Sequence, residues 1–133
     1  MTRHLLAAAT SIAASLAANV AYANSEYSCV VLDMLNFSDD SEFIAKNMEK
    51  RFLITLDEER VYVTTLSEDF TNSQSIYVIV NRSLSSVYGV ELSSVSMDTI
   101  ALSETLFEGR FNATLLRQST LGVTVWKLGC DAA

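Results

Sequence analysis

The chain has 133 residues, half of them hydrophobic, and its 16 acidic and 9 basic side chains give a net charge of −7. This apolar content excludes a disordered chain. The negative charge disfavours nucleic acid and anionic membranes as partners, because both are bound through basic patches.

Residues 1–23 have the pattern of a cleavable secretory signal peptide. A basic start with Arg3 and His4 precedes an Ala-rich stretch without charge, which ends at the small-residue motif Ala21-Tyr22-Ala23. Polar residues interrupt this stretch, so it falls short of the roughly 20 strongly apolar residues of a membrane span. We therefore expect export to the periplasm or the medium, no stable membrane insertion, and one domain over residues 24–133.

The residues that remain after cleavage limit the chemistry of this domain. It would hold 16 acidic against 8 basic residues, a balance of −8, and no histidine, because the single histidine is His4. Histidine-dependent catalysis and histidine-ligated zinc or copper are therefore excluded. The two cysteines, Cys29 and Cys130, form an even pair in an exported chain and are expected to be joined as a disulfide. With both thiols paired, we expect neither an enzyme nor a cofactor.

In chain order, residues 27–35 are apolar and β-branched enough for a first strand. Residues 39–50 are the one stretch that predicts a helix. Asp39 and Glu42 resemble a capping box, and acidic residues precede basic ones, as the helix dipole prefers.

From residue 51 the apolar residues alternate with a period of two, which indicates strands. Residues 52–56 and 61–66 predict a hairpin, and residues 76–80 are apolar on both sides, as in a central strand. Four further strands are expected, over residues 87–92, 95–102, 106–116 and 121–128. In 106–116 the alternation places Phe107, Gly109, Phe111, Ala113 and Leu115 toward the core.

These elements predict a mainly β fold, a small antiparallel barrel or sandwich of about eight short strands with one short helix near the start of the domain. A disulfide between Cys29 and Cys130 would close the domain at its two ends.

The candidate partner contacts are the acidic turn Asp57-Glu58-Glu59 and the single tryptophan, Trp126. Trp126 is predicted to pack in the core or to contact a partner. The acidic clusters are expected to be solvated turns. The alternating residues 36–42 have oxygen-bearing side chains suited to calcium, but they lack the glycine of an EF-hand loop.

Two families share features with this sequence. Tyr27-Ser28-Cys29 and Gly129-Cys130 are similar to the ends of the periplasmic lysozyme inhibitors, but residues 85–88 lack the glycine of their inhibitory loop. The expected strand count is similar to that of lipocalin-like barrels, but their Gly-x-Trp motif is absent. The sequence is assigned to neither family.

The function expected from these observations is a non-catalytic exported binding or protein-interaction module, whose protein partner would be basic because the domain is acidic. The alternative is a lipocalin-like carrier of a small apolar ligand. A closed barrel around an apolar cavity would favour the carrier, and a filled core would favour the interaction module.

Overall fold

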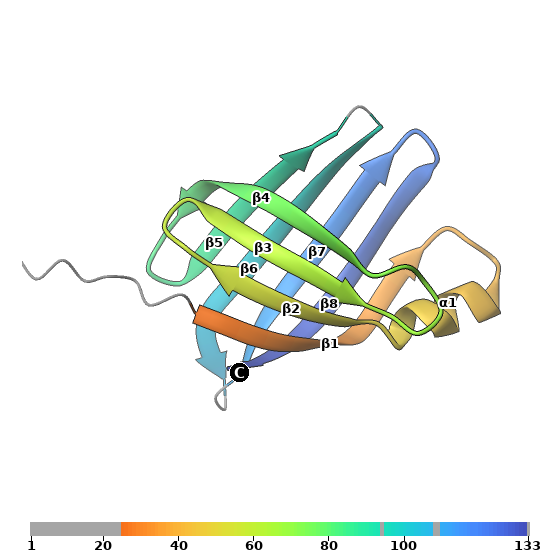
Figure 1. Cartoon of the computed structure of the whole chain (residues 1–133), viewed down its shortest axis with the longest axis horizontal. Coiled ribbons are helices and arrows are strands. Elements are labelled where there is room, and N and C mark those ends of the chain that lie inside the picture. Colours follow the sequence, from red (N-terminus) through yellow and green to blue (C-terminus); the bar gives the residue numbers. More distant parts are fainter. Residues whose placement is uncertain (1–24, 94, 108–109, 133) are drawn as a thin grey trace, which may run out of the picture.

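The computed structural model describes residues 25–93, 95–107 and 110–132, with side chains described except at Ser25, Arg110 and residues 104–107. The predicted signal peptide, residues 1–23, lies outside the described residues. The described chain forms a closed barrel of eight antiparallel strands, in which each strand pairs with its neighbours in sequence (Figure 1). Between the two predicted architectures, the barrel is therefore the correct one.

The strands follow one another with a single helix after the first. The elements are β1 (Ser25–Asn36), α1 (Ser41–Met48), β2 (Arg51–Leu56), β3 (Arg60–Leu66), β4 (Ser73–Arg82), β5 (Ser86–Leu92), β6 (Ser96–Phe107), β7 (Arg110–Ser119) and β8 (Gly122–Ala132).

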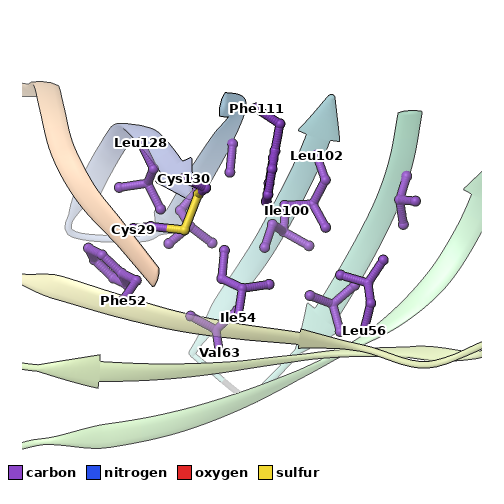
Figure 2. Close-up of a cluster of buried hydrophobic side chains, with 14 of the residues drawn as sticks. Cys29, Phe52, Ile54, Leu56, Val63, Ile100, Leu102, Phe111, Leu128 and Cys130 are labelled. Carbon is purple, nitrogen blue, oxygen red and sulfur yellow. A yellow bond between two sulfur atoms is a disulfide. The ribbon is translucent and has the colours of Figure 1, made fainter. Parts of the chain in front are cut away.

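The barrel closes where β1 pairs with β8. Cys29 lies directly opposite Cys130 in this register, and the two form the predicted disulfide. Both cysteines are fully buried and face the lumen, where Figure 2 shows the bridge among the apolar side chains. The disulfide thus joins the first strand to the last inside the core, in agreement with a non-reducing environment.

The core fills the lumen around this disulfide. Its side chains come from inward positions of successive strands, among them Ile54, Val63, Ile100, Phe111 and Leu128 (Figure 2). In β7, Phe111, Ala113 and Leu115 are buried while Asn112 and Thr114 are exposed, so the predicted register of this segment is confirmed. The predicted inward positions 107 and 109 lie outside the described side chains.

The two ends of the barrel differ, and we name them here. The α1 end comprises α1 and the connections β3–β4, β5–β6 and β7–β8. The disulfide end comprises the start of β1, the end of β6, the start of β7, the end of β8 and the connections β2–β3 and β4–β5 (Figure 1).

Among the described residues, no helix combines the length and apolar character that crossing a membrane requires.

Helix α1 begins one residue later than the capping prediction implied. Asp40, and not Asp39, is the N-cap, and its carboxylate accepts hydrogen bonds from the backbone N–H groups of Glu42 and Phe43. Lys46 forms an i,i+4 ion pair with Glu42, at 2.7 Å. The predicted capping box was wrong because either aspartate suits the cap by sequence, and the backbone at Asp40 has the extended conformation that a cap needs.

Two strand predictions also needed correction. The segment 106–116 is divided, because β6 continues through Phe107 and β7 begins at Arg110. Strand β4 buries only one face, so that Ile76, Val78 and Val80 are exposed on the outside of the barrel. A short run of apolar residues predicts a strand, but it does not tell whether both faces are covered.

Turns are built from serine, asparagine and aspartate side chains, as expected from the scarcity of glycine. In the β5–β6 connection, Ser93 Oγ accepts hydrogen bonds from the backbone N–H groups of Val95 and Ser96. Gly122, which begins β8, has a φ of 142°, a conformation that favours glycine over residues with a Cβ.

Candidate binding site at the α1 end of the barrel

Charged side chains occupy the lumen at the α1 end. On β7, the inward positions Phe111, Ala113 and Leu115 are followed in phase by Arg117. On β6, Asp98 precedes the inward Ile100 by two residues and so shares its face. Lys50, just before β2, stands in the same relation to Phe52. The inward faces of three segments therefore change from apolar to charged at the same end of the barrel.

Asp98 and Arg117 form an ion pair across the β6–β7 ladder, where they lie directly opposite each other. Arg117 Nε donates a hydrogen bond to Asp98 Oδ2 at 3.0 Å, and Arg117 Nη2 lies 3.0 Å from the same oxygen in the ion pair. The Asp98 side chain is 4% exposed and that of Arg117 is 56% exposed. The hydrogen bond to Asp98, together with the carboxylate's charge, raises the pKa of Arg117. The Arg117 guanidinium is thus the exposed member of the ion pair, at the mouth of the barrel.

Lys50 lies at the same mouth and has aromatic neighbours. Its Nζ lies 4.5 Å from the ring centroid of Phe70 and 5.4 Å from that of Trp126, distances typical of cation–π contacts. Among the described residues, Lys50 forms no ion pair. Burial, and secondarily the positive charge of Arg117, lower its pKa. The ammonium group is therefore held in a partly desolvated place with no carboxylate beside it.

Tyr77 forms part of the same lumen wall, and Gly89 makes space for it. A Cβ at Gly89 would come within 2.9 Å of Tyr77 Cβ and 3.0 Å of Ile100 Cγ2. Burial, with a smaller contribution from the charge of Asp98, raises the pKa of the Tyr77 phenol, so this group stays neutral and protonated. Tyr77 separates the apolar core from the charged mouth.

A cavity of about 170 Å³ lies between these groups. Its walls include the charged residues Lys50, Asp98 and Arg117, with Tyr77 and Trp126. Hydroxyl and apolar side chains complete the lining: Thr65, Thr71, Ser73, Ser75, Phe52, Val63, Leu115 and Leu116. The lining is therefore mixed, and its charged and hydroxyl groups distinguish it from the predominantly apolar pocket that a carrier of a hydrophobic ligand would need.

Two buried polar atoms in this lining have no hydrogen-bond partner among the described residues. They are Asp98 Oδ1, an acceptor, and Trp126 Nε1, a donor. An unpaired buried polar atom costs roughly 1–3 kcal/mol, so native proteins seldom leave one without a reason. Both residues line the same cavity as Lys50, which forms no ion pair among the described residues, and this marks the α1 end as the candidate site.

Exposed apolar side chains surround this mouth. Leu121 in the β7–β8 turn is 97% exposed and Phe37 after β1 is 79% exposed, and both border a surface hollow that Arg117 also lines. Val95 in the β5–β6 connection borders a second hollow beside Arg117. Singly exposed apolar side chains also occur elsewhere on the barrel, so what distinguishes these residues is their position beside the mouth.

The structure separates the candidate contacts named from sequence. Asp57, Glu58 and Glu59 form the β2–β3 turn at the disulfide end, whereas Trp126 lies in the lumen at the α1 end and packs against the core near Phe52. Asp57 Oδ1 accepts hydrogen bonds from the backbone N–H groups of Glu59 and Arg60, which lower its pKa. This carboxylate therefore shapes the turn, and the acidic turn and Trp126 lie toward opposite ends of the barrel.

No metal site emerges from the acidic clusters. Within the described part of the chain, no three acidic, histidine or cysteine side chains converge to hold a metal ion. In the 36–42 segment the side chains serve the local backbone: Asn36 Oδ1 accepts from the Ser38 N–H, and Asp40 caps α1.

Sequence reasoning did not identify Lys50, Asp98 and Arg117. The signal was present, since each continues an inward phase that the neighbouring apolar residues define. A charged residue at an inward position is expected only where function or pairing justifies it. Lys50 was placed at the end of the predicted helix 39–50, and Arg117 lies one residue beyond the predicted strand 106–116. Asp98 lies within the predicted strand 95–102, but its inward phase there was not used.

Comparisons with protein-family models, with curated proteins and with solved structures found no match to this chain.

Proposed function

We propose that this chain is an exported, non-catalytic binding module whose binding site is the α1 end of the barrel. The observation that carries the proposal is the cavity there, in which, among the described residues, Lys50 forms no ion pair and two buried polar atoms, on Asp98 and Trp126, have no hydrogen-bond partner. A ligand with complementary groups would pair with them.

Export is supported by two independent features. The first 23 residues have the composition of a signal peptide, and the disulfide between Cys29 and Cys130 suits a non-reducing compartment. The test is an intact-mass measurement on secreted protein, which should give a chain that begins at Asn24. A mass that retains His4 would contradict this proposal.

A non-catalytic role is supported by the side chains available. Both cysteines are in the disulfide, and the only histidine is His4, within the proposed signal peptide. The charged groups of the cavity are an arginine–carboxylate pair and a lysine, which suit binding and orientation of a ligand.

Carriage of a sizeable apolar ligand is less well supported. The apolar part of the lumen is filled by the core and the disulfide, and the remaining cavity has charged and hydroxyl groups in its wall beside the apolar ones. A basic protein partner stays a prediction from the net charge of −7. The exposed apolar rim with Phe37 and Leu121 is where such a partner would reach the α1 end.

The proposal is tested by blocking the cavity. Ser75→Phe places a ring in the lumen, and Gln74→Phe places the same ring on the outside of β4. Protein purified from its own host under native conditions is examined by native mass spectrometry for bound molecules. We expect the bound species to be lost in Ser75→Phe and kept in Gln74→Phe. Retention by both variants would place the binding surface elsewhere.

A further inference from the structure

The groups without partners in the cavity indicate which chemical groups a ligand would need. This inference rests on the proposed binding function of the α1 end. Lys50 supplies a positive charge, and Trp126 Nε1 supplies a hydrogen-bond donor without an acceptor. Both are complementary to an anion with more than one acceptor oxygen. Asp98 Oδ1 supplies an acceptor without a donor, and is complementary to a ligand O–H or N–H group.

The charges around the cavity favour a neutral hydroxyl over an ammonium group as the ligand's donor to Asp98 Oδ1. The Asp98 carboxylate is already paired with Arg117, so Lys50 leaves the site with one net positive charge. A ligand ammonium would therefore meet Lys50 and Arg117 with only one carboxylate between them. A neutral hydroxyl donates to Asp98 Oδ1 without adding a third cation.

The volume limits the size of the ligand. A cavity of about 170 Å³ is several times the roughly 30 Å³ that a water molecule occupies in the liquid, and it is smaller than the roughly 300 Å³ at which drug-sized pockets begin. The cavity thus suits a molecule with a few non-hydrogen atoms. The hydroxyl groups of Thr65, Ser73 and Ser75 in the wall can bond its remaining oxygens.

We propose that the cavity binds a small hydroxycarboxylate, with the carboxylate at Lys50 and Trp126 Nε1 and the hydroxyl at Asp98 Oδ1. Both atoms are enclosed in the described structure, so this binding requires neighbouring side chains to move and expose them. It also requires the Lys50 ammonium, which lies over the rings of Phe70 and Trp126, to turn to the carboxylate. The ligand then supplies the counter-ion that Lys50 lacks in the described structure.

The test uses lactate and two analogues, each of which differs from lactate by one group. Lactate has both the carboxylate and the hydroxyl, propionate lacks the hydroxyl, and lactamide lacks the charge. Trp126 is the only tryptophan of the chain, so its fluorescence reports on the cavity without a label, and calorimetry gives the affinity independently. We expect lactate to bind about tenfold or more tightly than either analogue, the effect of one charge-assisted hydrogen bond.

Two variants locate the binding. Lys50→Met keeps the length of the side chain and should weaken lactate binding about tenfold or more, and it should remove the preference for lactate over lactamide. Lys127→Met makes the same change on the exposed outer face of β8 and should leave the affinity unchanged. Thermal unfolding of both variants confirms that they are folded.

The possible failures are distinguishable. Equal binding of lactate and lactamide, or of lactate to the wild type and Lys50→Met, would overturn the hydroxycarboxylate while leaving the α1 end as a site. If no probe changes the Trp126 signal and the cavity holds ordered water only, the hydroxycarboxylate is wrong. If, in addition, the natural bound species survives Ser75→Phe, the proposed function fails as well.

Discussion

The two ends of the barrel are built on the same strands with opposite chemistry. Toward the disulfide end the inward positions hold Cys29, Ile54, Leu128 and other apolar side chains that are almost completely buried. Toward the α1 end the same strands turn charged and hydroxyl side chains inward, with Asp98 only 3% exposed. The strand periodicity does not change along the barrel, and the character of the inward residues does.

This contrast teaches where stability and binding reside. Apolar burial and the disulfide stabilise the fold at one end, with roughly 25 cal/mol for each Å² of apolar surface removed from water. The charged groups at the other end are costly to bury, and their partners are incomplete. A buried charged region that costs stability is retained when it serves a function. The four predictions below test the division between a stabilising disulfide end and a binding α1 end.

The largest effect is expected in the apolar core. Phe111→Ala on β7 removes a ring that meets Tyr27 at 4.3 Å between centroids, and it should lower the free energy of unfolding by about 3–5 kcal/mol. The neighbouring Asn112 faces solvent, so Asn112→Ala should change it by less than about 0.5 kcal/mol. Urea denaturation measures both, and a larger loss for Asn112→Ala would show that the register of β7 is inverted.

The disulfide is expected to have the next largest effect. Replacing both Cys29 and Cys130 by alanine removes a cross-link between residues 101 positions apart and should cost roughly 2–5 kcal/mol. The double variant avoids a leftover thiol. Its midpoint of urea denaturation should fall below that of the wild type. An unchanged midpoint would mean that the pairing of β1 with β8 closes the barrel without help from the bridge.

At the boundary between the two ends, Gly89→Ala should destabilise by roughly 1–3 kcal/mol, because the added Cβ meets Tyr77 Cβ and neither atom can swing away. Gly129→Ala is the matched control. Its Cβ would meet the outer atoms of the Leu32 side chain at 3.1–3.2 Å, and this exposed side chain can move. Thermal unfolding should therefore show a smaller loss for Gly129→Ala, and the reverse order would contradict the placement of Tyr77.

The smallest effect is expected at the charged end. Lys50→Met removes an unpaired, half-buried ammonium, so the variant should be equal to the wild type in stability or more stable by up to about 1 kcal/mol. The pKa of Lys50 is lowered in the folded state, so this state binds fewer protons than the unfolded one between that pKa and 10.5. The wild type should therefore gain stability relative to the variant as the pH rises through this window.

Lys46 gives the control for this pH dependence. Its pKa is raised, chiefly by the hydrogen bond to Glu42, so its contribution is present below 10.5 and is lost as the pH rises through the folded-state pKa. Against Lys46→Met the wild type should lose stability at high pH, the opposite of the trend for Lys50→Met. Unfolding curves from pH 7 to pH 11 decide this, and a parallel trend for the two lysines would contradict the account of Lys50.

The sequence was sufficient to predict most of the fold. Alternation of apolar residues identified the strands, because strand periodicity is a local property of the sequence. The even pair of cysteines identified the disulfide, because cysteines in an exported chain are expected to pair. The division of segment 106–116 between β6 and β7 was missed, since the apolar alternation there continues from one strand into the next. The cap at Asp40 was missed by one residue because Asp39 is chemically equivalent.

The candidate site was harder to predict than the fold. Lys50, Asp98 and Arg117 are 19 or more positions apart in sequence, and only closure of the barrel brings them to one mouth. Trp126 was named as a candidate contact, but its neighbours in space are Lys50 and Phe52 and not the acidic turn. The strand register could be read from the sequence. Which strand ends meet depends on the topology of the whole barrel.

The most direct test of the binding end is the nuclear magnetic resonance signal of the Trp126 indole N–H. The chain has one tryptophan, so a ¹⁵N-labelled sample gives one such signal, from the donor that lacks a partner. On titration with lactate the signal should shift downfield and saturate, while the backbone signals of Glu58 and Glu59 at the disulfide end stay in place. An indole signal that does not move, with shifts confined to the β2–β3 turn, would contradict the account.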